Sequence, residues 1–402
     1  MRVLLSTIGS RGDVQPLVAL ARQLLASGQE VHLCVPPDFQ DWITSLGMSV
    51  IPIGPKLRST GKASPSAPRP TPEQMRQMAE ASVAGQFETI MQAAQACDVL
   101  VGATALQIAA PSVAEKKDIP YHFAAYCPAV LPSRHHAPPV LGLLEDAPAP
   151  TPSDNARLWA QDAERFNLFR APLNSHRAAL GLAPITDVRG HIFTSQPWLA
   201  ADAVLAPWPE PDDASVFQTG AWILPDERRL SAELEAFLDA GDPPIYFGFG
   251  SNRTPDDISQ TVLNTARSLG RRALISQGWA ELSILEDEPD CLVIGETNIQ
   301  ELFKRVAAVV HHGGAGTTTL AALAGAPQVI LPQMYDQYYW AERVRQLGIG
   351  TALIPGTPTI HSLADALQHS LQPDVSAQAQ SLAVQVRTDG AQIAARHLIA
   401  AS

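Results

Sequence analysis

The segment AAVVHHGGAGTTTLAA, residues 307–322, joins a short apolar run to a glycine-rich turn and a run of small residues. The apolar run Ala307–Val310 predicts a buried strand, and Thr319–Ala324 predicts the helix after the turn. Glycine lets the backbone approach a ligand closely, and a helix start presents unpaired N–H groups to an anion. The turn has neither the lysine of a Walker loop nor the GxGxxG spacing of a dinucleotide fingerprint. This unit therefore predicts an α/β fold with a cradle for a diphosphate.

The same alternation of short apolar runs and helical stretches continues along the chain, which is typical of parallel sheets built from βαβ units. Apolar residues recur at helical spacing from Val14 to Leu25, and Gly28 is placed to end that helix. The expected strands are Arg2–Thr7, Glu30–Val35, Val50–Ile53, Val99–Gly102 and Tyr121–Ala125 in the first half, and Ile245–Phe249, Ala273–Ser276, Leu292–Ile294, Ala307–Val310 and Val329–Leu331 in the second.

The length of 402 residues favours two domains. We predict a Rossmann-like domain over residues 1–206, a linker over 207–225 and a second Rossmann-like domain over 226–376. Prolines stiffen the start of this linker, so Pro207–Pro211 is the hinge candidate. Residues 377–402 predict a helix that returns to pack on the first domain.

Two proline-rich segments, Gly54–Thr71 and Pro128–Ser153, predict long loops without regular structure. Loops of this length inside a compact domain usually belong to a binding site or are mobile. Plain surface disorder is the alternative, and the sequence leaves both open.

Composition and charge exclude several classes of function. Hydrophobic residues make up 46% and charged residues 17% of the chain, as in folded globular proteins. The net charge of −12 offers no basic surface to a nucleic acid or an anionic membrane. The apolar run Val3–Leu5 is too short for a signal peptide or a membrane span, so we expect a cytoplasmic protein without stable membrane insertion. The cysteines have no CxxC spacing and predict buried reduced thiols: Cys34, Cys97, Cys127 and Cys291.

Polar residues follow several predicted strands at the carboxyl edge, where open α/β sheets bind ligands. Asp13 ends the run Gly9-Ser10-Arg11-Gly12-Asp13 and is interpreted either as a helix cap or as a general base, and the two roles can coexist. Asp336 and Gln337 suit adjacent sugar hydroxyls, although such a pair in a loop is often only solvated. Ser251 either lines a ligand site or is a simple turn serine.

Seven segments together resemble the GT-B glycosyltransferases that use nucleotide sugars, in particular the glycopeptide-antibiotic glycosyltransferases of the vancomycin and teicoplanin type. The resemblance covers essentially the whole chain and is more specific than any single motif. It implies two Rossmann-like domains with parallel sheets facing across a cleft, and transfer of a hexose from a UDP- or dTDP-sugar to a small-molecule aglycone. The segments are MRVLLSTIGSRGDVQPLVALA, AEKKDIPYHF, LNSHRAALGL, FQTGAWILPDERRLSAELEAFLDAG, IYFGFGS, HHGGAGTT and LPQMYDQ.

The resemblance also implies a role for each candidate residue. Asp13 corresponds to the catalytic base, and Asp336 with Gln337 to the pair that binds the donor sugar. The stretch Gly295–Gln300, with Thr297 and Asn298, is similar to the loop that holds the nucleobase. Trp279 is a further candidate beside that base, although a packed core tryptophan is equally expected. The implied diphosphate ligands are His312, Gly313, Gly314, Gly316, Thr317, Ser251 and Ser10.

Family chemistry implies a single inverting displacement without a metal or other cofactor, and the sequence shows no DxD pair near the cradle. An ordinary Asp carboxylate, with a pKa of about 3.9, is a weak base for an alcohol, which favours a phenol of pKa about 10 as acceptor.

Two departures from the family pattern leave part of the substrate open. Leu320 stands where plant relatives carry the ribose-binding glutamate, and the segment Pro128–Pro172 matches the glycopeptide enzymes poorly. A polyketide, a sterol or a glycolipid is therefore an alternative acceptor. The competing functions are a nucleotide-sugar epimerase or phosphorylase on the same fold, and a nucleotide-binding protein without catalysis, which the intact Asp13 disfavours.

Overall fold

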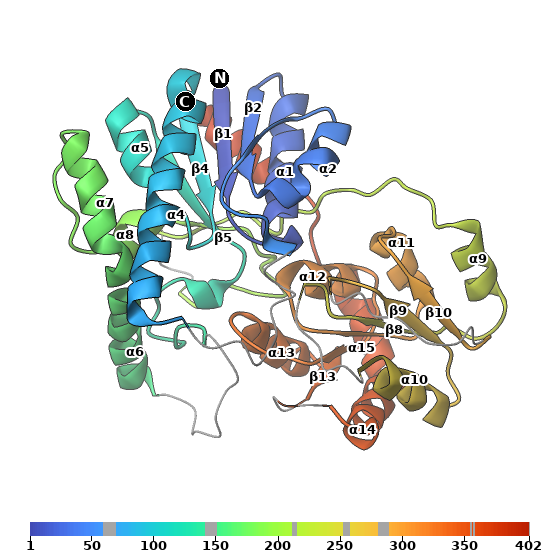
Figure 1. The fold of residues 1–402 in the computed structure, drawn as a ribbon. Coiled ribbons are helices and arrows are strands. Elements are labelled where there is room, and N and C mark those ends of the chain that lie inside the picture. Colours follow the sequence, from blue (N-terminus) through green and yellow to red (C-terminus); the bar gives the residue numbers. More distant parts are fainter. Residues whose placement is uncertain are drawn as a thin grey trace.

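Two parallel sheets, each flanked by helices, make up the molecule in the computed structural model (Figure 1). The structure describes residues 1–58, 70–140, 151–210, 215–251, 258–279, 289–353, 356 and 358–401. Most of the predicted loop Gly54–Thr71, and residues 141–150 of the predicted loop Pro128–Ser153, lie outside the described residues.

The first sheet has seven parallel strands in the order β3-β2-β1-β4-β5-β6-β7. The strand β1 lies in its centre, where Ser6 is aligned with Cys34 on one side and with Gly102 on the other. A parallel strand is buried on both faces, and this explains why continuous apolar runs predict these strands. The strands are β1 (Arg2–Thr7), β2 (Glu30–Val35), β3 (Ser49–Pro52), β4 (Val99–Ala103), β5 (Tyr121–Ala125), β6 (Trp198–Leu199) and β7 (Phe217–Gln218).

The second sheet has six parallel strands in the order β10-β9-β8-β11-β12-β13. Every strand predicted from the sequence is confirmed to within one residue at each end, whereas β6, β7 and β13 were not predicted. The strands of this sheet are β8 (Ile245–Gly248), β9 (Ala273–Ser276), β10 (Cys291–Ile294), β11 (Ala308–His311), β12 (Gln328–Ile330) and β13 (Gly350–Ala352).

Helices cover both faces of the first sheet, because successive side chains of β1 point to opposite sides. Leu4 faces a core formed with α4, α5, α7 and α8, while Val3 and Leu5 face α1, α2 and the C-terminal helix α16. The two chain ends therefore lie side by side on this domain (Figure 1). These helices are α1 (Arg11–Ala26), α2 (Gln40–Ser45), α4 (Pro72–Ala93), α5 (Ala110–Lys117), α6 (Pro152–Arg165), α7 (Asn167–Ala179), α8 (Val188–Phe193) and α16 (Gly390–Ala400).

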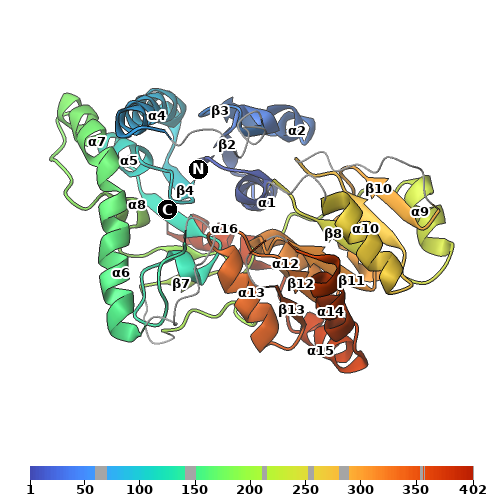
Figure 2. The ribbon, with the colours of Figure 1, turned by 60° about the horizontal axis from the view of Figure 1, so that its bottom comes forward.

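The second domain repeats this arrangement, with one helix turned toward the first domain. Trp340 and Val344 of α13 join the same core cluster as Leu4 of the first sheet, and Figure 2 shows α13 on the side that faces the first domain. The helices of this domain are α9 (Ala232–Asp239), α10 (Ile258–Ser268), α11 (Ile299–Leu302), α12 (Ala315–Leu323), α13 (Gln337–Gln346), α14 (Ile360–Ser370) and α15 (Pro373–Ala383).

The first part of the predicted linker 207–225 belongs to the first domain. The strand β7 lies inside that stretch and pairs with β6, and Trp208 is buried in the core of the first domain. Burial of this indole outweighs the extended bias of the neighbouring prolines, so residues 207–210 are part of the first domain and not the hinge, while Pro211 lies outside the described residues. The crossing runs from Gly220 to Leu230.

The single helix predicted over residues 377–402 is instead two helices. The first, α15, packs on α12 of the second domain, and only α16 packs on α1 of the first domain. Residues 384–389 between them form a second crossing. The two crossings touch at Gly220 and Gly390, where a Cβ on Gly390 would lie 2.4 Å from the Gly220 carbonyl carbon.

None of the described helices is long and apolar enough to cross a membrane. All four cysteines are buried thiols that form no disulfide, as expected. Burial raises the pKa of the Cys34 thiol to about 12, so this thiol stays protonated and unreactive at neutral pH.

The glycine contact between the crossings gives a stability prediction. Gly390→Ala places a Cβ against Gly220 backbone that cannot move aside, and we expect a loss of about 1–3 kcal/mol in the free energy of unfolding. Gly85→Ala in α4 is the control, because its Cβ would meet nothing within 4 Å and alanine favours the helix. Thermal unfolding should show a lower Tm for the first variant and an equal or higher Tm for the second. An unchanged Tm for Gly390→Ala contradicts the contact.

Candidate active site

Asp13 lies in the first turn of α1, just after the carboxyl end of β1. Its Oδ2 accepts hydrogen bonds from the Ser10 backbone N–H at 2.6 Å and from the Ser10 hydroxyl at 3.1 Å. Only glycine fits beside it, because a Cβ on Gly9 would lie 2.2 Å from Asp13 Oδ2. The carboxylate therefore closes the start of the helix while it stays at the ligand-binding edge of the sheet.

The surroundings of Asp13 strengthen it as a base. Burial raises the pKa of its carboxyl group, and the hydrogen bonds from Ser10 oppose that rise. The Tyr126 hydroxyl donates to the Asp13 carbonyl oxygen at 3.1 Å and holds this turn against β5. A carboxylate with a raised pKa accepts a proton from a hydroxyl more readily than an ordinary Asp does.

The two histidines at the end of β11 have different roles. His311 is buried, and its Nε2 lies 2.9 Å from Gln328 Oε1 while its Nδ1 accepts the Gly313 N–H at 3.1 Å. Because Nδ1 accepts, the proton resides on Nε2, and the ring fixes the backbone of the turn. Burial lowers the pKa of His311 to about 3, so it is a neutral structural residue.

His312 points into the predicted diphosphate site. Its ring lies between two glycines, since a Cβ on Gly250 would be 3.0 Å from Cε1 and a Cβ on Gly314 would be 2.6 Å from Nε2. Burial lowers the pKa of His312 to about 4, so the ring is neutral at pH 7. Its Nδ1 is buried and the Gly248 backbone is a hydrogen-bond partner of the ring, so Nε2, which lies beside Gly314, is the nitrogen next to the helix start. An imidazole nitrogen beside a helix start suits an anionic ligand.

We call residues 312–317 the glycine cradle. Gly313 has φ +90°, and a Cβ there would lie 2.7 Å from Ile330 Cγ2 and 3.1 Å from the Gln337 carbonyl oxygen. Gly316 is exposed in the first turn of α12 and has nothing within 4 Å, so its missing side chain leaves room for a ligand. The Thr317 hydroxyl bonds to no other described residue. Ser251 follows Gly250 and so lies near His312, whereas the Ser10 hydroxyl is bonded to Asp13.

Asp336 faces Asp13 from the second domain. Its Oδ2 accepts the Trp340 indole N–H at 3.1 Å. Burial, with a smaller contribution from the negative charge of Asp13, raises the pKa of Asp336 to about 7. The negative charge of Asp13 therefore acts on Asp336 across the domains and disfavours ionisation of both groups together.

Gln337 supports this loop from within. Its Oε1 accepts the backbone N–H of Gln333 at 2.8 Å and that of Met334 at 3.3 Å. Its carbonyl oxygen also lies against Gly313, which links the cradle to the loop of Asp336. The amide oxygen is therefore used inside the chain, where it holds the loop in place for the predicted sugar contact.

Three contacts hold the carboxyl edges of the two sheets together. The Tyr335 N–H donates to the Val140 carbonyl at 2.6 Å, with Tyr335 in the left-handed region at φ +56°. Arg343 Nε of α13 donates to the Leu205 carbonyl at 2.8 Å. Arg11 Nη1 lies 3.9 Å from a Glu296 carboxylate oxygen. The sequence gives no signal for these contacts, because each joins residues far apart in the chain.

The predicted nucleobase region is only partly available to a ligand. Asn298 caps α11 by accepting the N–H of Gln300 and Glu301, and donates to the carbonyls of Asp226 and Arg228. This uses the full hydrogen-bonding capacity of its side chain, so Asn298 is left with its backbone for a contact with a base.

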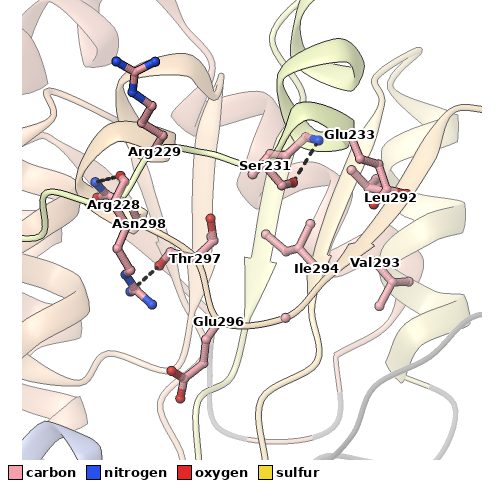
Figure 3. Close-up of a pocket in the computed structure, with 12 residues that line it drawn as sticks. Arg228, Arg229, Ser231, Glu233, Leu292, Val293, Ile294, Glu296, Thr297 and Asn298 are labelled. Atoms are coloured by element: carbon pink, nitrogen blue, oxygen red, sulfur yellow. Dashed lines mark hydrogen bonds between the residues drawn. The ribbon is translucent and has the colours of Figure 1, made fainter. Parts of the chain in front are cut away.

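Trp279 and Thr297 make fewer hydrogen bonds within the chain than Asn298 does. The Trp279 ring stacks on Phe39 of the first domain, with 6.5 Å between ring centroids, so it packs between the domains. The Thr297 carbonyl accepts a bond from Arg228 at 3.5 Å. A cavity of about 250 Å³ opens between Ile294–Asn298 and the crossing residues Arg228–Ser231 (Figure 3).

The described part of the chain contains no group of three or more His, Cys, Asp or Glu residues placed to hold a metal ion. Of the residues that shape the site, sequence reasoning missed Gly9, His311, Tyr335 and Arg343. Gly9 and His311 adjoin predicted residues and could have been suspected from the motifs, but their contacts depend on side-chain geometry.

Gly313 and Gly316 give a matched pair of predictions. Gly313→Ala adds a strained φ and a clash with Ile330, so we expect a lower Tm. Gly316→Ala should keep or raise the Tm, because alanine favours the first turn of α12. Gly316→Ala should also weaken binding of dTDP at least about tenfold, or about 1.4 kcal/mol, because the added methyl group separates the diphosphate from the backbone of the cradle. Differential scanning fluorimetry and calorimetric titration measure the two effects. Unchanged dTDP affinity in Gly316→Ala would remove the cradle as the anion site.

The raised pKa of Asp336 predicts a pH-dependent stability. The folded protein holds this proton up to about pH 7, whereas the unfolded chain loses it near the ordinary value of 3.8. The stabilisation of the folded state by protonated Asp336 is therefore complete below about pH 3.8 and declines as the pH rises from there to about 7. Asp336→Asn keeps an acceptor for Trp340 and removes the titration. We expect its Tm advantage over the wild type to be larger at about pH 8 than at about pH 5, and an equal difference at both would contradict the shift.

Comparison with known proteins agrees with this geometry. Residues 3–133 match the model of the glycosyltransferase family 28 N-terminal domain, and residues 274–394 match that of the erythromycin biosynthesis protein CIII-like C-terminal domain. Glycosyltransferase GtfE of Amycolatopsis orientalis is 49% identical and is matched over 100% of this chain and 98% of its own. Vancomycin aglycone glucosyltransferase of the same organism is 47% identical over 99% and 97%.

The fold has close structural counterparts. A Streptomyces glycosyltransferase solved with thymidine diphosphate superimposes with a TM-score of 0.63 at 20% identity, over 100% of both chains. That likeness concerns the fold, while the sequence relatives concern the family. The chain therefore belongs to the GT-B glycosyltransferases, in the branch of the glycopeptide-antibiotic enzymes, and is an enzyme that transfers a glycosyl group to an aglycone.

Proposed function

We propose that this glycosyltransferase moves a hexose from a UDP- or dTDP-sugar to a phenolic hydroxyl of a glycopeptide aglycone. The observation that carries the proposal is geometric: Asp13 lies in the first turn after β1, and the glycine cradle is joined through Gly313 to the loop of Asp336 and Gln337. The negative charge of Asp13 also contributes to the raised pKa of Asp336, so the two carboxyl groups act on each other across the domains. The first domain thus supplies a base for the acceptor hydroxyl, and the second supplies an anion site for the donor diphosphate. Such an arrangement holds the two substrates next to each other for transfer.

The donor diphosphate would lie at the start of α12. The free N–H groups of that helix and Nε2 of His312, beside Gly314, would stabilise its charge. The relative solved with thymidine diphosphate supports a nucleoside diphosphate here, and the loop 295–298 with its cavity is the candidate for the nucleoside end. We assign Asp336 to the hydroxyls of the donor sugar, which a carboxylate binds by charge-assisted hydrogen bonds.

The chemistry is a single displacement at the anomeric carbon. Asp13 takes the proton of the acceptor hydroxyl as its oxygen bonds to that carbon. The bond from carbon to the diphosphate oxygen breaks with its electron pair, and the nucleoside diphosphate leaves with the negative charge. One displacement inverts the configuration, and the cradle stabilises the leaving group without a required metal.

The acceptor class rests on two arguments. The raised pKa of the Asp13 carboxyl group lies closer to the pKa of a phenol, which is about 10, than the pKa of an ordinary Asp does. The relative named for the vancomycin aglycone supports a glycopeptide rather than a polyketide, sterol or glycolipid. Location in the cytoplasm stays a prediction.

The test is a turnover assay of the purified enzyme with UDP-glucose or dTDP-glucose and vancomycin aglycone, with and without EDTA. We expect a glucosylated aglycone of inverted anomeric configuration by NMR, at equal rates in both buffers. Asp13→Asn keeps an oxygen for the Ser10 N–H, so we expect a loss of about 10²- to 10⁴-fold in kcat with unchanged dTDP affinity.

Each outcome has a distinct meaning. The absence of product with every donor and acceptor contradicts the proposal. Loss of activity in EDTA contradicts the metal-free step. A parallel loss of dTDP affinity and kcat in Asp13→Asn assigns Asp13 to structure instead of catalysis.

A further inference from the structure

The loop that follows β4 has an inverted pattern of burial. Leu106 exposes 47% of its surface, whereas its polar neighbour Gln107 is 0% exposed. The hydrophobic effect favours the opposite arrangement. The loop starts at Thr104, which holds the left-handed conformation at φ +69° that a β-branched residue rarely adopts. Residues 104–107 therefore combine a strained backbone with an exposed leucine and a buried amide.

Gln107 is also unpaired. Neither its Oε1 nor its Nε2 has a hydrogen-bond partner in the described part of the chain. Gln86 of α4 shows the ordinary case, since it is equally buried and fully used: its Oε1 accepts the Ala109 N–H at 3.1 Å and its Nε2 donates to Ser82 Oγ at 3.2 Å. A buried amide without partners costs about 1–3 kcal/mol, so it calls for a function.

The loop lies beside the catalytic turn. Thr7, the last residue of β1, donates from its hydroxyl to the Ala103 carbonyl at 3.1 Å. The Thr104 hydroxyl donates to the Ile8 carbonyl at 3.5 Å, next to Gly9 and Asp13. Both loops leave the carboxyl edge of adjacent strands, where the acceptor hydroxyl must reach Asp13.

We propose that Gln107 is a specificity-determining residue that binds a backbone amide of the acceptor. This inference rests on the proposed function. A carboxamide offers a donor and an acceptor side by side, which matches the C=O and N–H of a peptide and not the oxygens of a polyketide or sterol. When the acceptor binds, the loop turns so that Leu106 packs on the apolar face of the aglycone and Gln107 pairs with its amide. Binding thus relieves both the unpaired amide and the exposed leucine.

The test compares Gln107→Met with the matched variant Gln86→Met. Methionine keeps the length of the side chain and removes its polar atoms, so Gln107→Met should raise the Tm while Gln86→Met lowers it. The dissociation constant of vancomycin aglycone, followed by tryptophan fluorescence without donor, should rise at least about tenfold in Gln107→Met. Turnover of the wild-type enzyme with this aglycone is measured in parallel.

The outcomes separate this inference from the proposed function. A lower Tm in Gln107→Met shows that Gln107 has a structural partner and overturns the inference, as does an unchanged dissociation constant. A wild-type enzyme that does not bind the aglycone overturns it as well, yet transfer to another acceptor would leave glycosyl transfer in place. Gln107→Leu serves as the second variant if the methionine protein does not fold.

Discussion

The hydrogen bond from Arg343 to the Leu205 carbonyl joins α13 of the second domain to the first domain, beside the core cluster that both domains share. Leu205 belongs to a turn held by Asp202, whose carboxylate accepts the N–H of Val204 and Leu205 and, across the second crossing, that of Arg387. This buried carboxylate thus fixes both ends of the domain contact. The helix α13 extends from there to Asp336, so this contact acts on the active site together with the Tyr335–Val140 hydrogen bond next to Asp336.

Much of the fold could be predicted because burial on both faces makes parallel strands apolar throughout. The same reasoning failed for β6, β7 and β13, since runs of two or three residues carry no period. It also failed for residues 207–211, where local proline chemistry suggested a hinge and tertiary burial of Trp208 prevailed. The broken C-terminal helix was missed for a related reason: Asp389 and Gly390 start α16, but nothing nearby indicates that two domains share the segment.

Residues of the site divide in the same way. Asp13 and His312 stand in local motifs at strand ends, so sequence and resemblance found them. The roles of Gln337 and Asn298 were not predictable, because their amides are used by backbone groups that only the folded chain brings near. Tyr335 is the clearest example: a tyrosine carries no sign of a left-handed conformation, which the Val140 contact imposes from the other domain.

The helix α16 completes the core of the domain that begins the chain. During synthesis the part of α1 that packs on α16 therefore stays uncovered until α16 has left the ribosome, so the first domain cannot finish folding before the second has been made. The same connectivity governs chimeras. A first domain exchanged between relatives must be cut at both crossings and must bring its own α16, because a single junction would pair α1 with a foreign helix.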